Sequence, residues 1–349
     1  MDTLSIRDIA KMAGVSVSTV SRVLNGYSDV SARTKARVQQ IIQQCGYQPN
    51  NAARNLKRSR SNAVGLLMEG SATPFVTGLS DLLEEEINAH GYALVPHRVT
   101  HGVSGVDTAV QLVKEKRLQG LIICGGYFIH TLAELQRLTV PTVFCTTTLS
   151  GIDPAAYSSV RVDDFRAAKQ AVGYLCAIGH RQIAILGGIR DDRGGVSSLR
   201  FQGYRAALSE HAIPFDARLA RFCGLFTMQR GYDAVCELLS AGLRPTAIFC
   251  VADELAVGAC KAIFQAGLRV PQDISVMGYD GTEIARFYEP SLCTVRQPST
   301  HIAHKTAEIL VSLMEGEGSN RHVVFPTEIV IGGSCMPPPT SGGAAECIS

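Results

Sequence analysis

The sequence predicts an α/β protein in which a small all-helical head precedes a larger, two-lobed body built on parallel sheets. Two patterns lead to this prediction. Apolar side chains recur at helical spacing in the first fifty residues, whereas from Ala63 onward short apolar runs alternate with amphipathic helical stretches in two successive series. At 349 residues, the chain is also longer than one compact core usually supports.

Charge is divided unevenly along the chain. Residues 1–60 hold ten Lys or Arg and three Asp or Glu, a net charge of +7, and because the whole chain carries +2, the remaining residues carry −5. With 46% hydrophobic residues, the chain has enough apolar material for packed cores. A short basic segment before an acidic body indicates attraction to phosphate groups, although a solvated basic surface would have the same composition.

Three short helices with a shared core are expected in residues 1–49. Ser5 and Asp8 form a capping-box pattern, and the helix that they begin is predicted to stop at Gly14. Ser16 is placed to cap a second helix, and Ser31 a third. This arrangement is typical of a helix-turn-helix domain, whose second helix enters the major groove of DNA, but a small helical packing module has a similar pattern.

The second predicted helix directs several side chains outward near its start. We expect Arg22 to make a bidentate contact with guanine and Val17 to meet a thymine methyl group. The predicted phosphate contacts are Thr19, Ser21, Asn25 and Ser31. The remaining DNA-binding residues predicted in the head are Ser5, Ser16 and Ser18.

Three segments of the head closely resemble the lactose-repressor family of bacterial transcriptional regulators: SIRDIAKMAGVSVSTVSRVLN (residues 5–25), VSART (30–34) and GYQPN (46–50). In that family, the segment that follows is a hinge that becomes helical only on operator DNA, and a leucine of this hinge inserts into the minor groove. The resemblance therefore implies a sequence-specific regulator and gives Leu56 the role of that leucine.

Residues 50–61 are accordingly predicted to form a hinge helix or linker. Asn50 is a good N-cap residue, and the run that follows it is too short to be helical alone in water, so its folding should be coupled to DNA binding. The predicted DNA contacts of the hinge are Asn50, Ala53, Arg54, Leu56 and Lys57. Without the resemblance, a flexible linker that happens to contain a leucine would fit equally well.

Two series of strands and helices are predicted in residues 62–336. Buried parallel strands are expected at residues 64–68, 92–95, 120–124 and 142–145, and then at 183–186, 246–250 and 274–277. Helices are expected at residues 78–90, 106–117, 165–178, 199–211, 229–241 and 254–266. Two sheets imply two lobes, with boundaries at about 62–160 plus 293–320 and 161–290 plus 321–336. Residues 337–349, rich in Pro, Gly, Ser and Ala, are predicted to be a disordered tail.

A ligand site is expected between the lobes, because open parallel sheets bind ligands at the carboxyl ends of their strands. Segments of the body also resemble the family, whose body is similar to the periplasmic sugar-binding proteins; they include VDD (162–164), RFQGY (200–204), GYD (278–280) and TVRQP (294–298). The resemblance implies that Phe75 packs on the effector, that Arg200 grips it and that Asp280 accepts its hydroxyl hydrogens. Such a trio suits a sugar.

The sequence departs from the family pattern at two positions of this site. Ala252 stands before Asp253 where relatives often carry Asn, and Val76 occupies a position where an aromatic residue is common. Together with Asp163, Ala252 and Asp253 complete the predicted effector-binding set, and Asp253 is expected either to reach the ligand or to cap the helix that begins at Glu254. A sugar or sugar derivative is the predicted effector, and a nucleobase is the alternative.

No catalytic motif is found. The sequence contains no G-x-x-x-x-G-K-[ST], G-x-S-x-G or H-E-x-x-H pattern, so we predict neither an enzyme nor a cofactor. We interpret His301 and His304, three residues apart, as packing or solvated side chains rather than metal ligands. A polar start, no membrane-length apolar stretch and eleven scattered cysteines without a C-x-x-C pair lead us to expect a cytoplasmic protein with reduced thiols.

The expected partners are inverted-repeat operator DNA, a small-molecule effector and a second copy of the chain, without a membrane. A symmetric operator requires a symmetric reader, and the family likeness suggests residues 78–90 and 257–266 for the dimer surface. Three other interpretations stay open: a transport solute-binding protein, a sugar-modifying enzyme on the same body, and a DNA-binding protein whose site is empty.

Overall fold

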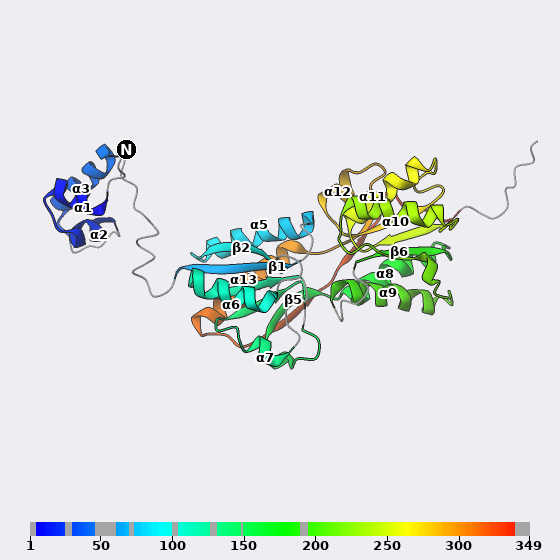
Figure 1. Ribbon diagram of the computed structural model, residues 1–349, viewed down its shortest axis with the longest axis horizontal. Coiled ribbons are helices and arrows are strands. Elements are labelled where there is room, and N and C mark those ends of the chain that lie inside the picture. The colour runs from blue at the N-terminus through cyan, green and yellow to red at the C-terminus, as the bar shows by residue number, and fades with distance from the viewer. Residues whose placement is uncertain are drawn as a thin grey trace, which may run out of the picture. The chain divides into compact units, whose positions relative to one another are not determined.

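The computed structural model describes residues 5–24, 30–45, 61–69, 73–99, 104–125, 131–147, 149–188 and 195–338. They belong to two compact units, Met1–Arg60 and Ser61–Ser349, which are treated separately below (Figure 1). The first unit is the predicted head. Its described helices are α1 (Ile6–Ala13), α2 (Val17–Leu24) and α3 (Ala32–Cys45), as the sequence predicts.

The second unit contains two six-stranded sheets. In the first sheet the strands lie in the order β11-β5-β4-β3-β1-β2, and every neighbouring pair is parallel. These strands are β1 (Ala63–Glu69), β2 (Ala93–Val99), β3 (Gly120–Cys124), β4 (Thr142–Cys145), β5 (Ser158–Val162) and β11 (His322–Phe325). Helices α5 (Pro74–Ala89), α6 (Gly105–Lys116), α7 (Leu132–Leu135) and α13 (Ser299–Glu315) belong to this lobe, which also contains the short turn η1 (Pro154–Ala156).

The second sheet has the order β12-β10-β9-β8-β6-β7 and is parallel except for the edge pair of β10 and β12. Its strands are β6 (Ile183–Gly187), β7 (Ala220–Phe222), β8 (Ala247–Cys250), β9 (Ser275–Asp280), β10 (Cys293–Arg296) and β12 (Glu328–Val330). Its helices are α8 (Asp164–Ala177), α9 (Val196–Glu210), α10 (Met228–Ser240), α11 (Asp253–Gln265) and α12 (Glu283–Phe287), with the turn η2 (Ala217–Leu219). The pair α8 and α9 and the pair α10 and α11 cover opposite faces of this sheet (Figure 1).

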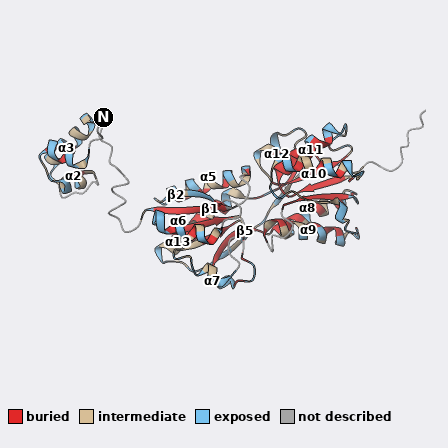
Figure 2. Ribbon diagram, viewed as in Figure 1, coloured by how far each residue is buried: buried red, intermediate tan, exposed pale blue. Residues whose placement is uncertain are grey.

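Strand patterning explains the layers of the first lobe. Along β1, Val64 and Leu66 belong to the core shared with α5 and α13, whereas Leu67 belongs to the core shared with α6. Successive strand side chains point to opposite faces of a sheet, so a strand that is apolar at every position must be covered on both faces. The central strands of both sheets are accordingly buried, the edge strands are partly exposed, and the outer faces of the helices are exposed (Figure 2).

The predicted lobe boundaries need one correction. Residues 293–296 were assigned to the first lobe, but they form β10, which pairs with β9 in the second sheet. Residues 322–325 were assigned to the second lobe, but they form β11, which pairs with β5 in the first sheet. Short apolar strands fit either sheet by pattern, and only the hydrogen-bonded neighbour decides between them. The chain thus crosses between lobes after β5, after β10 and between β11 and β12.

The ordered body extends slightly into the predicted tail. Pro338 packs near Gly179, and the His180 Nε2 atom lies 2.9 Å from the carbonyl oxygen of Met336, which holds this segment against the second lobe. The rest of the predicted tail lies outside the described residues.

Candidate functional site

The three helices of the head enclose one small core. Its fully or nearly fully buried members are Ile9, Ala10, Ala13, Val20, Val23 and Val38. The capping-box prediction is confirmed, because the Asp8 carboxylate accepts hydrogen bonds from the backbone N–H and the hydroxyl of Ser5. Gly14 ends α1 with φ of 61°, a left-handed conformation that glycine adopts without strain. This core fixes the position of α2 relative to the other two helices.

The first turn of α2 presents an exposed polar surface. Val17 is 41% exposed and Ser18 is exposed as well, and so is Arg22 in the last turn of the helix, as the outward assignment requires. The Ser16 hydroxyl accepts the Thr19 backbone N–H at 3.1 Å, which confirms Ser16 as the cap of α2. Hydroxyl groups and free N–H groups at a helix start form a favourable environment for a phosphate.

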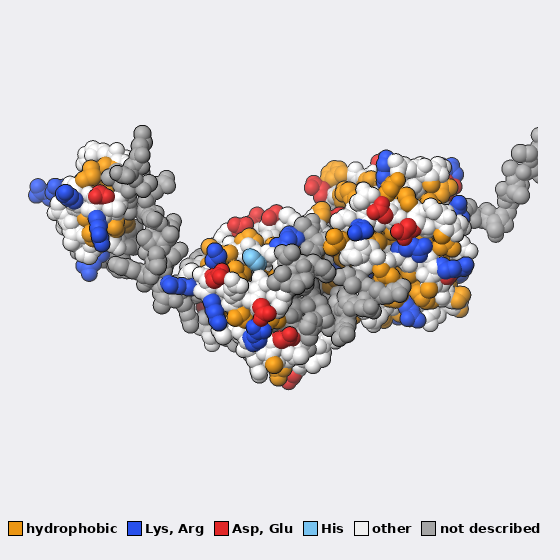
Figure 3. All heavy atoms as spheres, in the orientation of Figure 1, with side chains coloured by type: hydrophobic (Ala, Val, Ile, Leu, Met, Phe, Trp, Pro, Cys, Tyr) orange, Lys and Arg blue, Asp and Glu red, His pale blue; other side chains and the backbone are white. Residues whose placement is uncertain are grey.

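A second capped helix start is found at α3. The backbone N–H of Thr34 donates to the Ser31 hydroxyl at 3.3 Å, so Ser31 caps this helix as predicted. Lys and Arg side chains are visible on the head in Figure 3. The other predicted DNA contacts, Asn25, Asn50, Ala53, Arg54, Leu56 and Lys57, lie outside the described residues.

In the body, Arg200 is the centre of a buried polar cluster. Its guanidinium Nε donates to Asp164 Oδ1 at 2.8 Å, and its Nη1 donates to the carbonyl oxygen of Val251 at 2.6 Å. The same guanidinium stacks 3.7 Å above the centre of the Tyr279 ring and lies 3.6 Å from Asp280 Oδ1. Burial alone would lower the pKa of Arg200, but the neighbouring acidic groups, Asp164 foremost, raise it above its usual value, so the residue stays charged.

Asp280 occupies the carboxyl end of β9 in an unusual conformation. Its φ of 106° is outside the regions that side-chain-bearing residues normally adopt, and such strain is often found at functional sites. The Gln297 amide donates to Asp280 Oδ1 at 2.7 Å. Burial raises the pKa of Asp280 well above its ordinary value, although Arg200 opposes this shift. An added donor, such as a ligand hydroxyl, would favour the ionised carboxylate.

Asp253 is fully buried, and its two oxygens are already engaged. Oδ2 accepts from the backbone N–H and hydroxyl of Thr282 at 2.7 and 2.8 Å, and Oδ1 accepts from the Thr294 hydroxyl at 2.6 Å. A Cβ atom at Gly278 would lie 2.3 Å from Asp253 Oδ1, so glycine is required there. These bonds favour a supporting role for Asp253 over direct ligand contact. Ala252, at the cap position of α11, is completely buried and has no side-chain polar group to offer.

Glu254 was not predicted to be functional, yet it stands out in the structure. It is 4% exposed, and neither carboxylate oxygen has a hydrogen-bond partner within the described part of the chain. Burial raises the pKa of Glu254 to about 7, and the adjacent Asp253 adds to the shift. A buried carboxyl group without donors avoids the charged form. Nothing in the sequence pattern distinguishes it from a solvated residue at the start of a helix.

The structure therefore brings together two residues of the predicted effector set, Arg200 and Asp280. They belong to one polar cluster with three residues that are not among the predicted contacts: Asp164, Tyr279 and Gln297. All three lie within or beside the quoted segments 162–164, 278–280 and 294–298, so adjacency to those segments was the available signal. Phe75 belongs to the other lobe, where it is half-buried at the start of α5, and no described contact joins it to this cluster. Asp163 caps α8 by accepting the Arg166 N–H at 3.0 Å.

The two histidines of α13 do not form a site together. His304 Nδ1 lies 3.0 Å from Glu86 Oε2, whereas the ring of His301 lies near Phe325. No group of three or more His, Cys, Asp or Glu residues within the described ranges is arranged to hold a metal ion. A search of the same ranges found no helix long and apolar enough to cross a membrane.

Comparison with known proteins agrees with both halves of this description. Residues 5–50 match the family of bacterial regulatory proteins called the lacI family, and residues 172–335 match a periplasmic binding protein-like domain. MalR of Clostridium butyricum, an HTH-type transcriptional regulator, is 38% identical over 95% of this chain and 99% of its own length.

Solved structures have the same architecture. The lac repressor dimer bound to operator and the anti-inducer ONPF has a TM-score of 0.81 and 29% identity, covering 96% of this chain and all of that one. The complex of the transcriptional regulator CelR with cellobiose has a TM-score of 0.70 and 28% identity, covering 95% and 99%. The fold and site thus define a transcriptional regulator, rather than an enzyme, with a DNA-binding head and a periplasmic-binding-protein-like body. The chain belongs to the LacI family.

Proposed function

We propose that this regulator acts in the cytoplasm as a homodimeric repressor of an inverted-repeat operator and that an unphosphorylated sugar controls its affinity for DNA. The single observation that carries the choice of effector is the cluster of Arg200 with Asp164 and Asp280. Its strained aspartate and buried arginine offer a charged acceptor and a charged donor side by side, which matches the paired hydroxyl groups of a sugar.

The acidic character of this site argues against an anionic effector. Asp253, Glu254 and Asp280 are all buried, and burial raises the pKa of each. A phosphate group beside them would raise these pKa values further and would itself lose hydration in a poorly solvated environment. We therefore assign direct contact to Arg200 and Asp280, stacking to Phe75, and support to Asp163, Ala252 and Asp253.

For DNA, we assign base contacts to Val17 and Arg22 and phosphate contacts to the capped starts of α2 and α3. The exposure of the first turn of α2 and the hydroxyl groups of Ser16 and Ser31 support this assignment. The remaining proposed contacts of the head are Ser5, Ser18, Thr19, Ser21 and Asn25, and those of the hinge are Asn50, Ala53, Arg54, Leu56 and Lys57. Leu56 is assigned to the minor groove.

For the dimer, we propose that α5, α11 and α12 form the interface. Phe287 is 71% exposed at the end of α12, and Phe264 is 40% exposed on α11. Exposed aromatic side chains on neighbouring helices are typical of surfaces that a second chain covers. Effector binding would then change the angle between the lobes and the spacing of the two hinges, and a coupling of about 1–3 kcal/mol is sufficient for regulation.

The test is operator binding by the full-length protein, measured by fluorescence anisotropy with a panel of mono- and disaccharides, sugar phosphates and purine bases. An unphosphorylated sugar should change operator affinity at least about fivefold. Arg22→Ala should weaken operator binding by about 1–3 kcal/mol and relax the preference at one base pair. A response to a sugar phosphate or purine alone would refute the assigned effector class, and Phe287→Glu protein that remains dimeric would refute the interface.

A further inference from the structure

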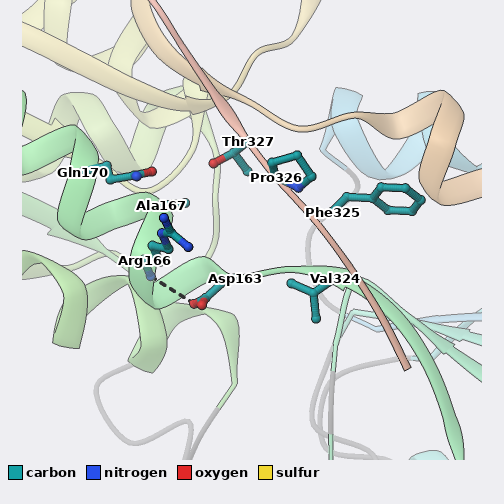
Figure 4. A pocket seen from close by; sticks show the side chains of 8 residues that line it. All are labelled: Asp163, Arg166, Ala167, Gln170, Val324, Phe325, Pro326 and Thr327. Atoms are coloured by element: carbon teal, nitrogen blue, oxygen red, sulfur yellow. Dashed lines mark hydrogen bonds between the residues drawn. The ribbon is translucent and has the colours of Figure 1, made fainter. Parts of the chain in front are cut away.

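A cavity lies beside the strand that crosses from the first sheet to the second. Its volume is about 290 Å³. Figure 4 shows the side chains that line it. Its lining residues are Asp163, Arg166, Ala167, Gln170, Val324, Phe325, Pro326 and Thr327. Phe75, Arg200 and Asp280 do not border it; Asp163, which has a supporting role in the proposed effector site, is the one residue of that set in its lining.

The cavity has one wall from each lobe. Asp163 to Gln170 belong to the start of α8, which packs on the second sheet, whereas Val324 and Phe325 end β11 of the first sheet. Pro326 and Thr327 form the crossing itself, between β11 and β12. A proline has no N–H to donate, so the strand leaves its sheet there. On the α8 wall, the small side chain of Ala167 lies between Arg166 and Gln170 in the sequence and is itself buried.

The chemistry of the walls is amphipathic. Arg166 and Gln170 are exposed on the α8 side, and within the described residues neither side chain takes part in a hydrogen bond or ion pair. On the other side, Val324 is 48% exposed although it is apolar. Asp163 is the acidic lining residue, and its Oδ1 is engaged in capping α8. The cavity therefore offers a guanidinium and an amide, neither with a partner among the described residues, opposite an apolar surface.

We infer that this cavity binds a small monocarboxylate with an apolar body and that its occupancy is coupled to the angle between the lobes. The carboxylate would pair with Arg166, whose planar guanidinium suits bidentate contact, and Gln170 would donate a further hydrogen bond. The apolar body would cover Val324 and Pro326. At about 290 Å³ the cavity is at the small end for ligand pockets, which suits a molecule of about ten non-hydrogen atoms rather than a disaccharide.

Occupancy of the cavity is coupled to the angle between the lobes because its two walls belong to different lobes. A ligand that touches α8, β11 and the crossing strand binds best at one arrangement of the two lobes and shifts the population toward it. Operator affinity would change as well, because in the proposed function the angle between the lobes controls the spacing of the two hinges. The site itself does not depend on that proposal.

The experiment uses the full-length protein, with benzoate as the probe and benzamide as its neutral counterpart, and measures binding by isothermal titration calorimetry. Benzoate should bind saturably and benzamide at least about tenfold more weakly, because the amide carries no charge for Arg166. Arg166→Gln should weaken benzoate binding about tenfold, and Gln170→Trp, which fills the cavity from an exposed position, should abolish it. The matched control is Lys169→Gln, on the same helix but paired with Glu210 and outside the cavity, and it should bind as the wild type does.

Two outcomes would show that benzoate does not bind as proposed: no saturable binding, or equal binding by the wild type and Arg166→Gln. Loss of benzoate binding in Asp280→Asn would also overturn the site, because it would mean that benzoate binds at the effector site. For the coupling, saturating benzoate should change operator affinity at least threefold, and an unchanged affinity would overturn it. A protein that binds benzoate but no operator would refute the proposed function while supporting the cavity.

Discussion

The carboxyl edges of the two sheets differ sharply in chemistry. In the second lobe, the described edge gathers a buried arginine and several buried acids, with Arg200 and Asp280 at its centre. At the first lobe's edge, the groups at the start of α5 and at the ends of β3 and β4 are uncharged: Thr73 caps α5, and Cys124 and Cys145 are register neighbours at the ends of β3 and β4. Thr306 donates its hydroxyl hydrogen to the Cys145 sulfur at 3.5 Å.

This difference indicates that the two lobes have different roles in holding a ligand. Charge-assisted hydrogen bonds fix the orientation of a ligand, and the buried cluster of Arg200 and Asp280, which can make them, lies in the second lobe. The first lobe has the half-buried Phe75, which suits stacking. A ligand would then be held first by the second lobe, and closure of the first lobe over it would complete the site. The following four changes test this difference in roles, from the largest expected effect to the smallest.

Arg200→Ala should be the most damaging change. It leaves the buried Asp164 and Asp280 without their cation, and breaking a buried ion pair costs about 3–5 kcal/mol of unfolding free energy. Urea unfolding followed by circular dichroism would measure this loss. Arg205→Ala, on the same helix but exposed and stacked 5.0 Å from the Phe215 ring, is the control and should cost less than about 1 kcal/mol. Equal effects of the two changes would mean that the cluster is not the electrostatic centre of the lobe.

Asp280→Asn should abolish the effector response while leaving operator affinity nearly unchanged. Asparagine tolerates the positive φ at this position, so the backbone should be preserved, but the charged acceptor is lost. We expect effector affinity to fall by about 2–3 kcal/mol, measured by calorimetry with the sugar that the operator assay identifies. Asp273→Asn, at an exposed pair with Arg269, should bind the sugar normally. A full response by Asp280→Asn would place recognition elsewhere.

Glu254→Gln should stabilise the protein at pH 8 and have no effect at pH 4. The pKa of Glu254 in the folded state is raised to about 7, so its contribution to stability is complete below the ordinary value near 4.5 and is lost as pH rises through about 7. Above pH 7 the buried charge should cost about 1–3 kcal/mol, which the neutral amide avoids. Thermal unfolding of both proteins across this range would measure the difference. Glu283→Gln, at an exposed position, should show none, and a pH-independent difference for Glu254→Gln would contradict the buried charge.

Phe75→Ala should have the smallest effect on the ligand site. Loss of one stacking surface should weaken sugar binding by about 1 kcal/mol without changing the pH dependence of stability. Titration calorimetry at one pH is sufficient to see this change. If Phe75→Ala weakened binding more than Asp280→Asn does, the first lobe, and not the second, would dominate recognition.

Much of this molecule was predictable from local pattern. The capping box at Ser5, the caps at Ser16 and Ser31, and the left-handed stop at Gly14 depend on residues three or four apart, and the structure confirms them. The strands at residues 120–124 and 142–145 also have the predicted bounds, because continuous apolar runs of that length fit a sheet covered on both faces.

The contacts between distant segments were not predictable in the same way. The sequence by itself determined a basic helical head and two series of parallel strands, because propensity, capping and periodicity act over a few neighbouring residues. The predicted effector residues came instead from the resemblance to the family. Only the tertiary structure decided that β10 belongs to the second sheet and β11 to the first, that Asp164 and Tyr279 both contact Arg200, and that Glu254 is buried without a hydrogen-bond partner among the described residues. Those facts depend on pairing and desolvation between residues tens of positions apart, which no local pattern specifies.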